Sequence, residues 1–208
     1  MMADQGFWDR LATKYAAQPI KDPGSYEKTL ARIRYHLSVQ DQVLEVGCGT
    51  GSTGLLLAGH VAHYVATDIS QNMLDFGIKN AQSQGIENIE FRRAAVDDAA
   101  IGPGPYSVIL ALNFLHLVPD IPGTVKTLSN LLAPGGLMIS KTVCLGEQAW
   151  KYRPPLTLMR WLGKAPYVNI VTPADVRQAM LVNLFEIKET GDFPPKPPCH
   201  FIVARKPL

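Results

Sequence analysis

The stretch that decides the fold is Val43-Leu44-Glu45-Val46-Gly47-Cys48-Gly49-Thr50-Gly51. An apolar run with the character of a β-strand leads into three glycines at alternate positions, and a helical pattern follows them. Glycines let the backbone turn sharply and bring its amides against a ligand, because they carry no Cβ. The start of the next helix favours a carboxylate or a phosphate. The stretch therefore predicts a strand, a ligand-binding loop and a helix.

The alternation of strand and helix continues on the C-terminal side of this loop. The expected strands are Val43–Val46, Val61–Thr67, Ile89–Arg93, Ser107–Leu112 and Leu137–Thr142. The expected helices are Gly51–Ala58, Gln71–Gln84 and Pro122–Leu132, with Gly85 and Gly135 where helices should end. Strands joined by helices of this length form βαβ units, so the sequence predicts an α/β fold with a parallel sheet and right-handed crossovers.

The N-terminal part, from Asp4 to Leu37, has a helical pattern. Apolar residues recur at helical spacing on both sides of the turn Asp22-Pro23-Gly24-Ser25, and we expect Ser25 to cap the second helix. The first residues lack the basic and then apolar run of a signal peptide, so we expect a cytoplasmic location.

The C-terminal part departs from the alternation. Residues 144–170 combine aromatic and basic side chains with prolines that we expect to break up regular structure. Thr172-Pro173-Ala174-Asp175 predicts the start of a helix. The last two apolar runs, Leu184–Thr190 and His200–Ala204, are separated only by a proline-rich link at 193–198, and so short a connection suits an antiparallel pair.

Composition describes a globular chain of one domain. The 208 residues (22.8 kDa) include 47% hydrophobic and 18% charged residues, which suits one α/β domain and is too short for two. A formal charge of +2 gives no basic footprint, so we expect no nucleic-acid partner. Single, widely spaced cysteines (Cys48, Cys144 and Cys199) favour neither disulfides nor a metal site. The apolar run Tyr106–Val118 is too short to span a bilayer, so we expect no stable membrane insertion.

Two carboxylates flank the glycine loop in the predicted sheet. Asp68 ends the strand after the loop, where a carboxylate is well placed to accept hydrogen bonds from ribose hydroxyls. Glu45 lies at the end of the first strand and is able to attract the ammonium of an amino acid. A ligand with an adenosine end and an amino-acid end therefore explains Glu45, the loop and Asp68 together.

A dinucleotide is the competing ligand. Gly49-x-Gly51-x-x-Gly54 fits the dinucleotide pattern, and Asp68 follows at a suitable distance. In dinucleotide folds, however, the first glycine directly follows the strand, and here Gly47 holds that place. A pyrophosphate also leaves Glu45 without a role. Because the glycine pattern and Asp68 still fit a dinucleotide, an NAD-dependent oxidoreductase stays as the less favoured alternative.

These motifs resemble those of the class I S-adenosylmethionine-dependent methyltransferases, particularly the small-molecule branch. The similarity covers nearly the whole chain and rests on four segments: 7–15, 45–51, 68–74 and 131–136. The resemblance implies a Rossmann-like seven-stranded sheet of order 3-2-1-4-5-7-6 with the last strand antiparallel, N-terminal lid helices, and S-adenosyl-L-methionine as the cofactor. The residues it assigns to the donor site are Tyr15, Glu45, Gly47, Cys48, Gly49, Gly51, Asp68, Ile69, Met73, Ala95, Val96, Asp97 and Asn113.

One position departs from the family pattern. Family members usually carry an acid after the third strand that meets the adenine amino group, and that place falls on Ala95 here. Either Asp97 takes over through a shifted loop, or the backbone groups of Ala95 and Val96 suffice.

The acceptor side carries fewer signals. Asn113 and His116 follow the fourth strand, facing the expected methyl group, and are the candidate catalytic residues. Alignment supplies much of the acceleration of methyl transfer, and a base is needed only when the nucleophile must lose a proton. His116 is either that base or a packing residue.

The segment organisation that we expect is a single domain over residues 1–208. Its parts are lid helices at 1–37, a donor-binding core at 42–142, a substrate lid at 143–170, and a last helix and strand pair at 171–208. The aromatic and basic stretch Trp150–Val168 suits a small, partly apolar acceptor methylated at O, N or S. Two other interpretations of this stretch are contact with a membrane surface and ordinary packing. For the chain as a whole, the other interpretation is a donor-binding protein without catalysis.

Overall fold

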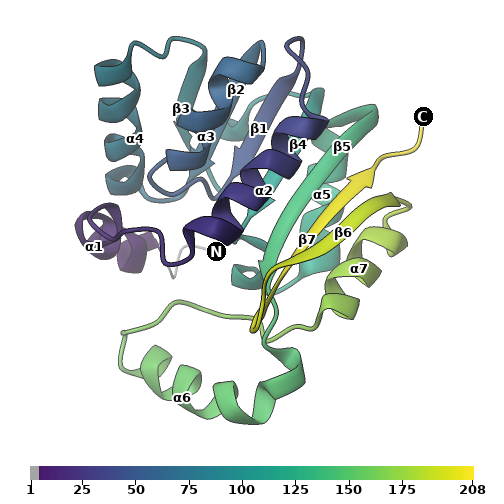
Figure 1. The fold of residues 1–208 in the computed structure, drawn as a ribbon. Coiled ribbons are helices and arrows are strands. Elements are labelled where there is room, and N and C mark those ends of the chain that lie inside the picture. The colour runs from purple at the N-terminus through teal and green to yellow at the C-terminus, as the bar shows by residue number, and fades with distance from the viewer. Residues whose placement is uncertain (1–4) are drawn as a thin grey trace.

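In a computed structural model that describes residues 5–208, the chain folds around one seven-stranded sheet (Figure 1). The strand order β3-β2-β1-β4-β5-β7-β6 is the predicted one. β7 is antiparallel to both of its neighbours, and the pairs among β1 to β5 are parallel. The strands are β1 Gln42–Val46, β2 His63–Asp68, β3 Ile89–Arg93, β4 Tyr106–Leu112, β5 Leu132–Val143, β6 Glu186–Pro195 and β7 Pro198–Arg205.

Helices cover both faces of this sheet. One face packs against α2 and α3 through Leu30, Ile33 and Leu57, and the other against α5 and α7 through Leu128 and Met180. α1 lies against α4, and α6 hangs below the body at the edge where β5 ends (Figure 1). The helices are α1 Gln5–Ala16, α2 Pro23–His36, α3 Ser52–Leu57, α4 Gln71–Gln84, α5 Ile121–Leu131, α6 Ala149–Trp161 and α7 Pro173–Val182. Short 3₁₀ turns are η2 Ala58–His60, η3 Ala99–Ile101, η4 Leu115–Leu117 and η5 Gly146–Gln148.

Three predicted boundaries are wrong, each for a local reason. The N-cap of α2 is Asp22 rather than Ser25, because the Asp22 carboxylate accepts the Ser25 N–H at 2.9 Å. α5 ends at Leu131, and Gly135, with a φ of 74°, lies within β5 where its register with β4 shifts, instead of ending a helix. β6 continues into the proline-rich link as far as Pro195; β6 is an edge strand, where proline is tolerated.

Two of the three prolines expected to break up the predicted lid do not do so, whereas Pro166 lies in the irregular segment after α6, as expected. Pro154 and Pro155 lie inside α6, and none of that helix's residues is buried. Proline removes a backbone N–H from the helix and so frees carbonyls of the preceding turn. In an exposed helix those carbonyls hydrogen-bond to water, which explains how two adjacent prolines are accommodated here.

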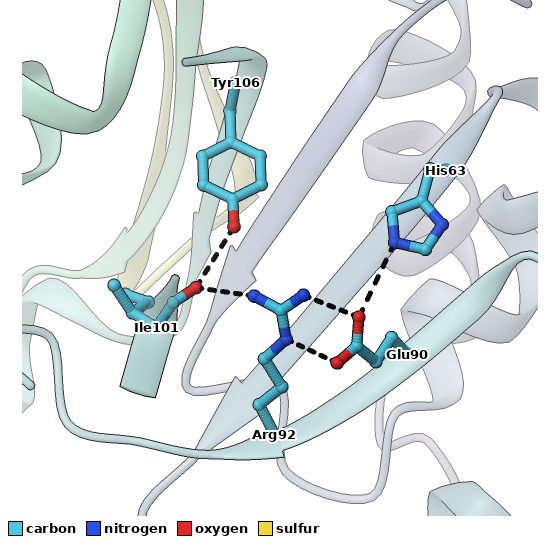
Figure 2. A network of polar contacts seen from close by, with 5 residues as sticks. All are labelled: His63, Glu90, Arg92, Ile101 and Tyr106. Carbon is cyan, nitrogen blue, oxygen red and sulfur yellow. Dashed lines mark hydrogen bonds and ion pairs between the residues drawn. The ribbon is translucent and has the colours of Figure 1, made fainter. Parts of the chain in front are cut away.

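A polar network lies near the amino ends of the strands (Figure 2). Arg92 on β3 donates to both carboxylate oxygens of Glu90 at 2.6 Å and to the Ile101 carbonyl at 3.0 Å. The Tyr106 hydroxyl donates to the same carbonyl at 3.1 Å, and His63 lies 3.7 Å from Glu90. Hydrogen bonding to Arg92 lowers the pKa of Glu90. The network joins β2, β3, η3 and β4 at the end of the sheet opposite the glycine loop.

Candidate functional site

The glycine loop adopts a backbone that only glycine accommodates well. Gly47, Gly49 and Gly51 have φ values of 67°, 56° and 70°, in the left-handed region. A Cβ at Gly47 would lie 2.5 Å from the ring of Phe114, and one at Gly51 would lie 2.5 Å from the ring of Phe91. The loop is thus fixed by φ and by two aromatic rings that occupy the space of the missing side chains.

Asp68 is held against this loop by backbone amides. Its Oδ2 accepts the Gly49 N–H and its Oδ1 accepts the Ser70 N–H, both at 2.9 Å. Burial raises the pKa of Asp68, and the amide bonds oppose that shift. A carboxylate oxygen has two lone pairs, so each oxygen still has acceptor capacity for a ligand hydroxyl. Asp68 is therefore oriented in advance as a bidentate acceptor.

Glu45 is a buried carboxylate beneath the same loop. Its exposed fraction is 3%, and its Oε2 accepts the Tyr64 hydroxyl at 2.8 Å. Burial raises the pKa of Glu45 to about 7. Within residues 5–208 neither Glu45 nor Asp68 forms an ion pair. A cationic group brought by a ligand would therefore stabilise the ionised form of Glu45.

Helix α1 brings Tyr15 over the loop. The Ser70 hydroxyl donates to the Asp9 carboxylate at 2.6 Å, and the Asn72 amide donates to the Asp9 carbonyl at 3.1 Å. These bonds fix α1 at the start of α4. The Tyr15 ring then lies 3.8 Å from where a Gly49 Cβ would stand. Tyr15 stays 46% exposed, and its partial burial, with the charges of Asp68 and Glu45, raises its pKa.

The other predicted donor-site residues surround this centre less tightly. Ile69 is half-buried next to Asp68, and Met73 is buried in the first turn of α4. Cys48 is a free thiol whose pKa is raised by burial. After β3, Val96 is buried, whereas Asp97 is exposed.

The turn after β3 is held by hydrogen bonds of Ala95 and Asp98. The Ala95 carbonyl accepts the Asp98 N–H at 3.1 Å, and the Asp98 carboxylate accepts the Ala100 N–H at 2.8 Å. Asp98 thus caps η3. The Ala94 N–H donates to the Asp68 carbonyl at 3.0 Å, which joins this turn to the carboxyl end of β2.

Asn113 and His116 differ in their environment. Asn113 is exposed at the end of β4 with a φ of 54°, a conformation that asparagine tolerates better than most residues, and its N–H donates to the Lys141 carbonyl at 2.7 Å. Burial lowers the pKa of His116 to about 4, so its ring is neutral at pH 7. Its Nδ1 is buried and has no hydrogen-bond partner among residues 5–208.

Several groups at this end of the sheet carried no recognised signal in the sequence. Lys141 is buried and donates to the Thr29 hydroxyl at 2.9 Å. His200 Nδ1 lies 2.8 Å from the Asp192 carboxylate, and its buried Nε2 has no partner in the described part of the chain. Thr142, the register partner of His200, also has a buried hydroxyl without a partner there. The pair of His200 and Asp192 arises from the register of the β6–β7 hairpin, and the neighbouring Thr142 from the register between β5 and β7.

Comparison with known proteins identifies the core. Residues 44–138 match the sequence family described as Methyltransferase domain. A ubiquinone biosynthesis O-methyltransferase of Acinetobacter baumannii (strain ACICU) is 32% identical over 103 residues, which are 49% of this chain and 44% of that protein. The Xylella fastidiosa (strain 9a5c) protein of the same name is 32% identical over 103 residues, 49% of this chain and 42% of its own. The match thus spans less than half the length of these relatives.

Solved structures extend the likeness to the whole fold. The N-methyltransferase NodS from Bradyrhizobium japonicum WM9, in complex with S-adenosyl-L-homocysteine, has a TM-score of 0.71 at 14% identity, covering 97% of this chain and 99% of its own. A Haloferax volcanii putative methyltransferase, in complex with the activator Trm112, has a TM-score of 0.82 at 13% identity, covering 99% and 98%. At these identities the likeness shows the fold alone.

The strand order and the glycine loop after β1 define a Rossmann-like fold, the fold that these methyltransferase structures share. Residues 44–138 of the chain match a methyltransferase domain, and the seven strands have the order that the sequence resemblance predicted.

Proposed function

We propose that the chain binds S-adenosyl-L-methionine and transfers its methyl group to a small, partly apolar acceptor at O, N or S. The observation that carries the proposal is the pairing of an oriented Asp68 carboxylate with a buried, uncompensated Glu45 carboxylate on either side of the glycine loop. A donor with a ribose at one end and an ammonium at the other satisfies both carboxylates.

The donor-side residues have separate tasks in this proposal. Asp68 accepts the ribose hydroxyls, the amides of Gly47–Gly51 and the carboxylate of Glu45 hold the amino-acid end, and Tyr15 covers the site. Ile69 and Met73 flank the adenine, with Cys48, Ala95, Val96, Asp97 and Asn113 at the border of the site. The bound donor supplies a methyl carbon already activated by a positive sulfur.

The acceptor-side residues position rather than ionise. Asn113 projects from the end of β4 and is exposed, so its amide is available to orient an acceptor. His116, with a pKa of about 4, is a weak base, and its neutral ring is suited to accept a hydrogen bond. Well-oriented reacting pairs gain about 7–11 kcal/mol of the barrier from alignment alone, so the proposal requires no strong base.

The acceptor class is supported from two directions. The curated relatives are named as O-methyltransferases of ubiquinone biosynthesis, which supports an oxygen acceptor with an apolar part. The aromatic and basic segment 143–170 suits an acceptor of the same class if it acts as a substrate lid. In this proposal residues 1–37 form the lid on the donor side, residues 42–142 form the core, and residues 171–208 form the last helix and strand pair. A cytoplasmic location without a nucleic-acid partner completes the proposal.

Equilibrium binding tests the donor. We expect calorimetry to show saturable binding of S-adenosylmethionine and S-adenosylhomocysteine and none of NAD. Binding of NAD alone would overturn the proposal in favour of an oxidoreductase. A labelled methyl group is then offered with pools of small metabolites. Transfer to a partly apolar acceptor is expected, whereas donor binding without transfer to any pool would make the chain a donor-binding protein without catalysis.

A further inference from the structure

Helix α6 presents an apolar stripe to solvent. Trp150, Pro154, Leu158 and Trp161 recur at intervals of one helical turn and line one open groove together with Arg153 and Thr157. The exposed fractions are 80% for each tryptophan and 57% for Leu158. Side chains of this size are rarely left in water without a function for the surface they form.

The apolar stripe of α6 does not pack against the hydrophobic core. No residue of α6 is buried, and the helix hangs below the body in Figure 1. Tyr152 and Leu156, on another side of the helix, are half-buried, so α6 contacts the rest of the chain there. The turn after α6 adds Leu162, which is exposed too. The tryptophan side therefore faces away from the domain.

The charge around the stripe has one sign. Residues 148–174 contain Lys151, Arg153, Arg160 and Lys164 and no aspartate or glutamate, in a chain whose formal charge is only +2. Among residues 5–208 none of these four cations forms an ion pair. Arg160 stacks on Tyr167 at 4.8 Å and Lys151 on Tyr152 at 5.6 Å, contacts that leave the charges in place.

We propose that α6 and the turn after it, residues 149–164, bind the surface of a bilayer that contains anionic phospholipid. Tryptophans at both ends of an apolar stripe suit the boundary between headgroups and acyl chains, where one part of the indole is wet and the other is not. The lysines and arginines around the stripe, which form no ion pair within residues 5–208, suit phosphate headgroups. The occupant must be anionic, since the segment offers no acid to a basic partner.

The attachment would be peripheral. No helix in residues 5–208 is long and apolar enough to cross a membrane. α6 lies beyond the end of β5, at the carboxyl edge of the sheet that also carries the glycine loop and Asn113. A bilayer bound there would lie next to the proposed acceptor site. The binding itself does not depend on methyl transfer, so it is tested without donor or acceptor.

The test is flotation of the full chain with vesicles of phosphatidylcholine alone or of phosphatidylcholine mixed with phosphatidylglycerol. We expect binding to the anionic vesicles, little to the neutral ones, and weakening at high salt. Trp150→Ser with Trp161→Ser, and separately Arg153→Gln with Arg160→Gln, should each weaken binding at least about tenfold. The matched control, Lys79→Gln with Lys126→Gln, removes two exposed cations elsewhere and should change it less than about twofold.

Three results would overturn the proposal. The first is no binding, or equal binding to neutral vesicles. The second is an equal loss in the Lys79 and Lys126 control, which would mean that net charge alone attracts the protein. The third is a dimer in sedimentation that both tryptophan substitutions abolish while vesicle binding persists, which would make α6 an interface between two copies. Circular dichroism and melting of each variant confirm that the fold is kept.

Discussion

The glycine loop and α6 lie toward the same edge of the sheet, yet they are built in opposite ways. The loop is fixed by three left-handed glycines, two aromatic rings and a carboxylate that accepts two amides. α6 contains two prolines and has no buried residue. The Methyltransferase domain match covers residues 44–138, so it includes the loop and ends before α6. The difference teaches that the glycine loop is held by local backbone and packing constraints, whereas α6 is attached to the body without burying any of its residues.

The largest expected effect comes from adding a methyl group to the loop. Gly51→Ala forces a residue with a Cβ to hold a φ of 70° and drives that Cβ to 2.5 Å from Phe91. We expect a loss of about 3 kcal/mol in the free energy of unfolding, measured with urea, from left-handed strain of about 1–2 kcal/mol and overpacking of about 1–3 kcal/mol.

Gly85→Ala is the matched control for that substitution. Gly85 has a φ of 65°, but a Cβ there would meet nothing within 4 Å. It should cost only the conformational part, about 1 kcal/mol. Equal losses in the two variants would mean that the Phe91 contact does not fix the loop, and the contrast between loop and α6 would lose one of its supports.

A second effect tests the buried charge. Glu45 has a pKa of about 7 when folded and an ordinary value of 4.5, so the folded state binds the proton more tightly. Glu45 should reduce the stability of the wild type as pH rises from about 4.5 to 7, by about 3 kcal/mol. Glu45→Gln keeps an acceptor for Tyr64 and removes the charge. It should match the wild type near pH 4.5 and exceed it near pH 8, in urea unfolding at both pH values.

The ligand provides the control for this experiment. In the proposed function an ammonium compensates Glu45, so saturating S-adenosylmethionine should stabilise the wild type at pH 8 more than it stabilises Glu45→Gln. A stability difference between the variants that does not change with pH would contradict the buried charge, and equal stabilisation by the ligand would remove Glu45 from its contacts.

The sequence predicted the loop well because its determinants are local. Alternating glycines, a preceding apolar strand and an acid at the next strand end lie within a short segment, and each has a direct backbone consequence. Strand order followed from the family resemblance. The contacts of Phe91 and Phe114 with the glycines were not predicted, because they join residues far apart in the sequence.

The contacts around His116, β7 and α6 were less predictable for a related reason. The pair of His200 and Asp192 depends on the register of a hairpin whose strand extends into a proline-rich link. His116 was expected beside the methyl group, but the sequence did not predict that its ring is buried. Burial lowers the pKa of His116 to about 4 and depends on residues that pack around the ring in the folded chain. α6 was expected as broken structure, since local propensity counts its prolines and not the solvent that satisfies the freed carbonyls.

A third effect concerns affinity rather than folding. Asp68→Ala removes the acceptor of the Gly49 and Ser70 amides and the proposed ribose contact. We expect calorimetry to show binding of S-adenosylhomocysteine weakened at least about tenfold, which is about 1.4 kcal/mol. Asp75→Ala, which removes an exposed carboxylate on α4, is the control and should bind as the wild type does. Unchanged affinity in Asp68→Ala would exclude Asp68 from the donor site.

The smallest expected effect lies on α6. Trp150→Ala with Trp161→Ala truncates two large side chains that are each 80% exposed, so little buried contact is lost. The free energy of unfolding should change by less than about 0.5 kcal/mol, as it does for ordinary surface substitutions. Set against Gly51→Ala, the deletion of two indoles would cost far less than the addition of one methyl group. A loss above about 2 kcal/mol would mean that the stripe packs against the domain in solution, and α6 would then belong with the rigid part of the molecule.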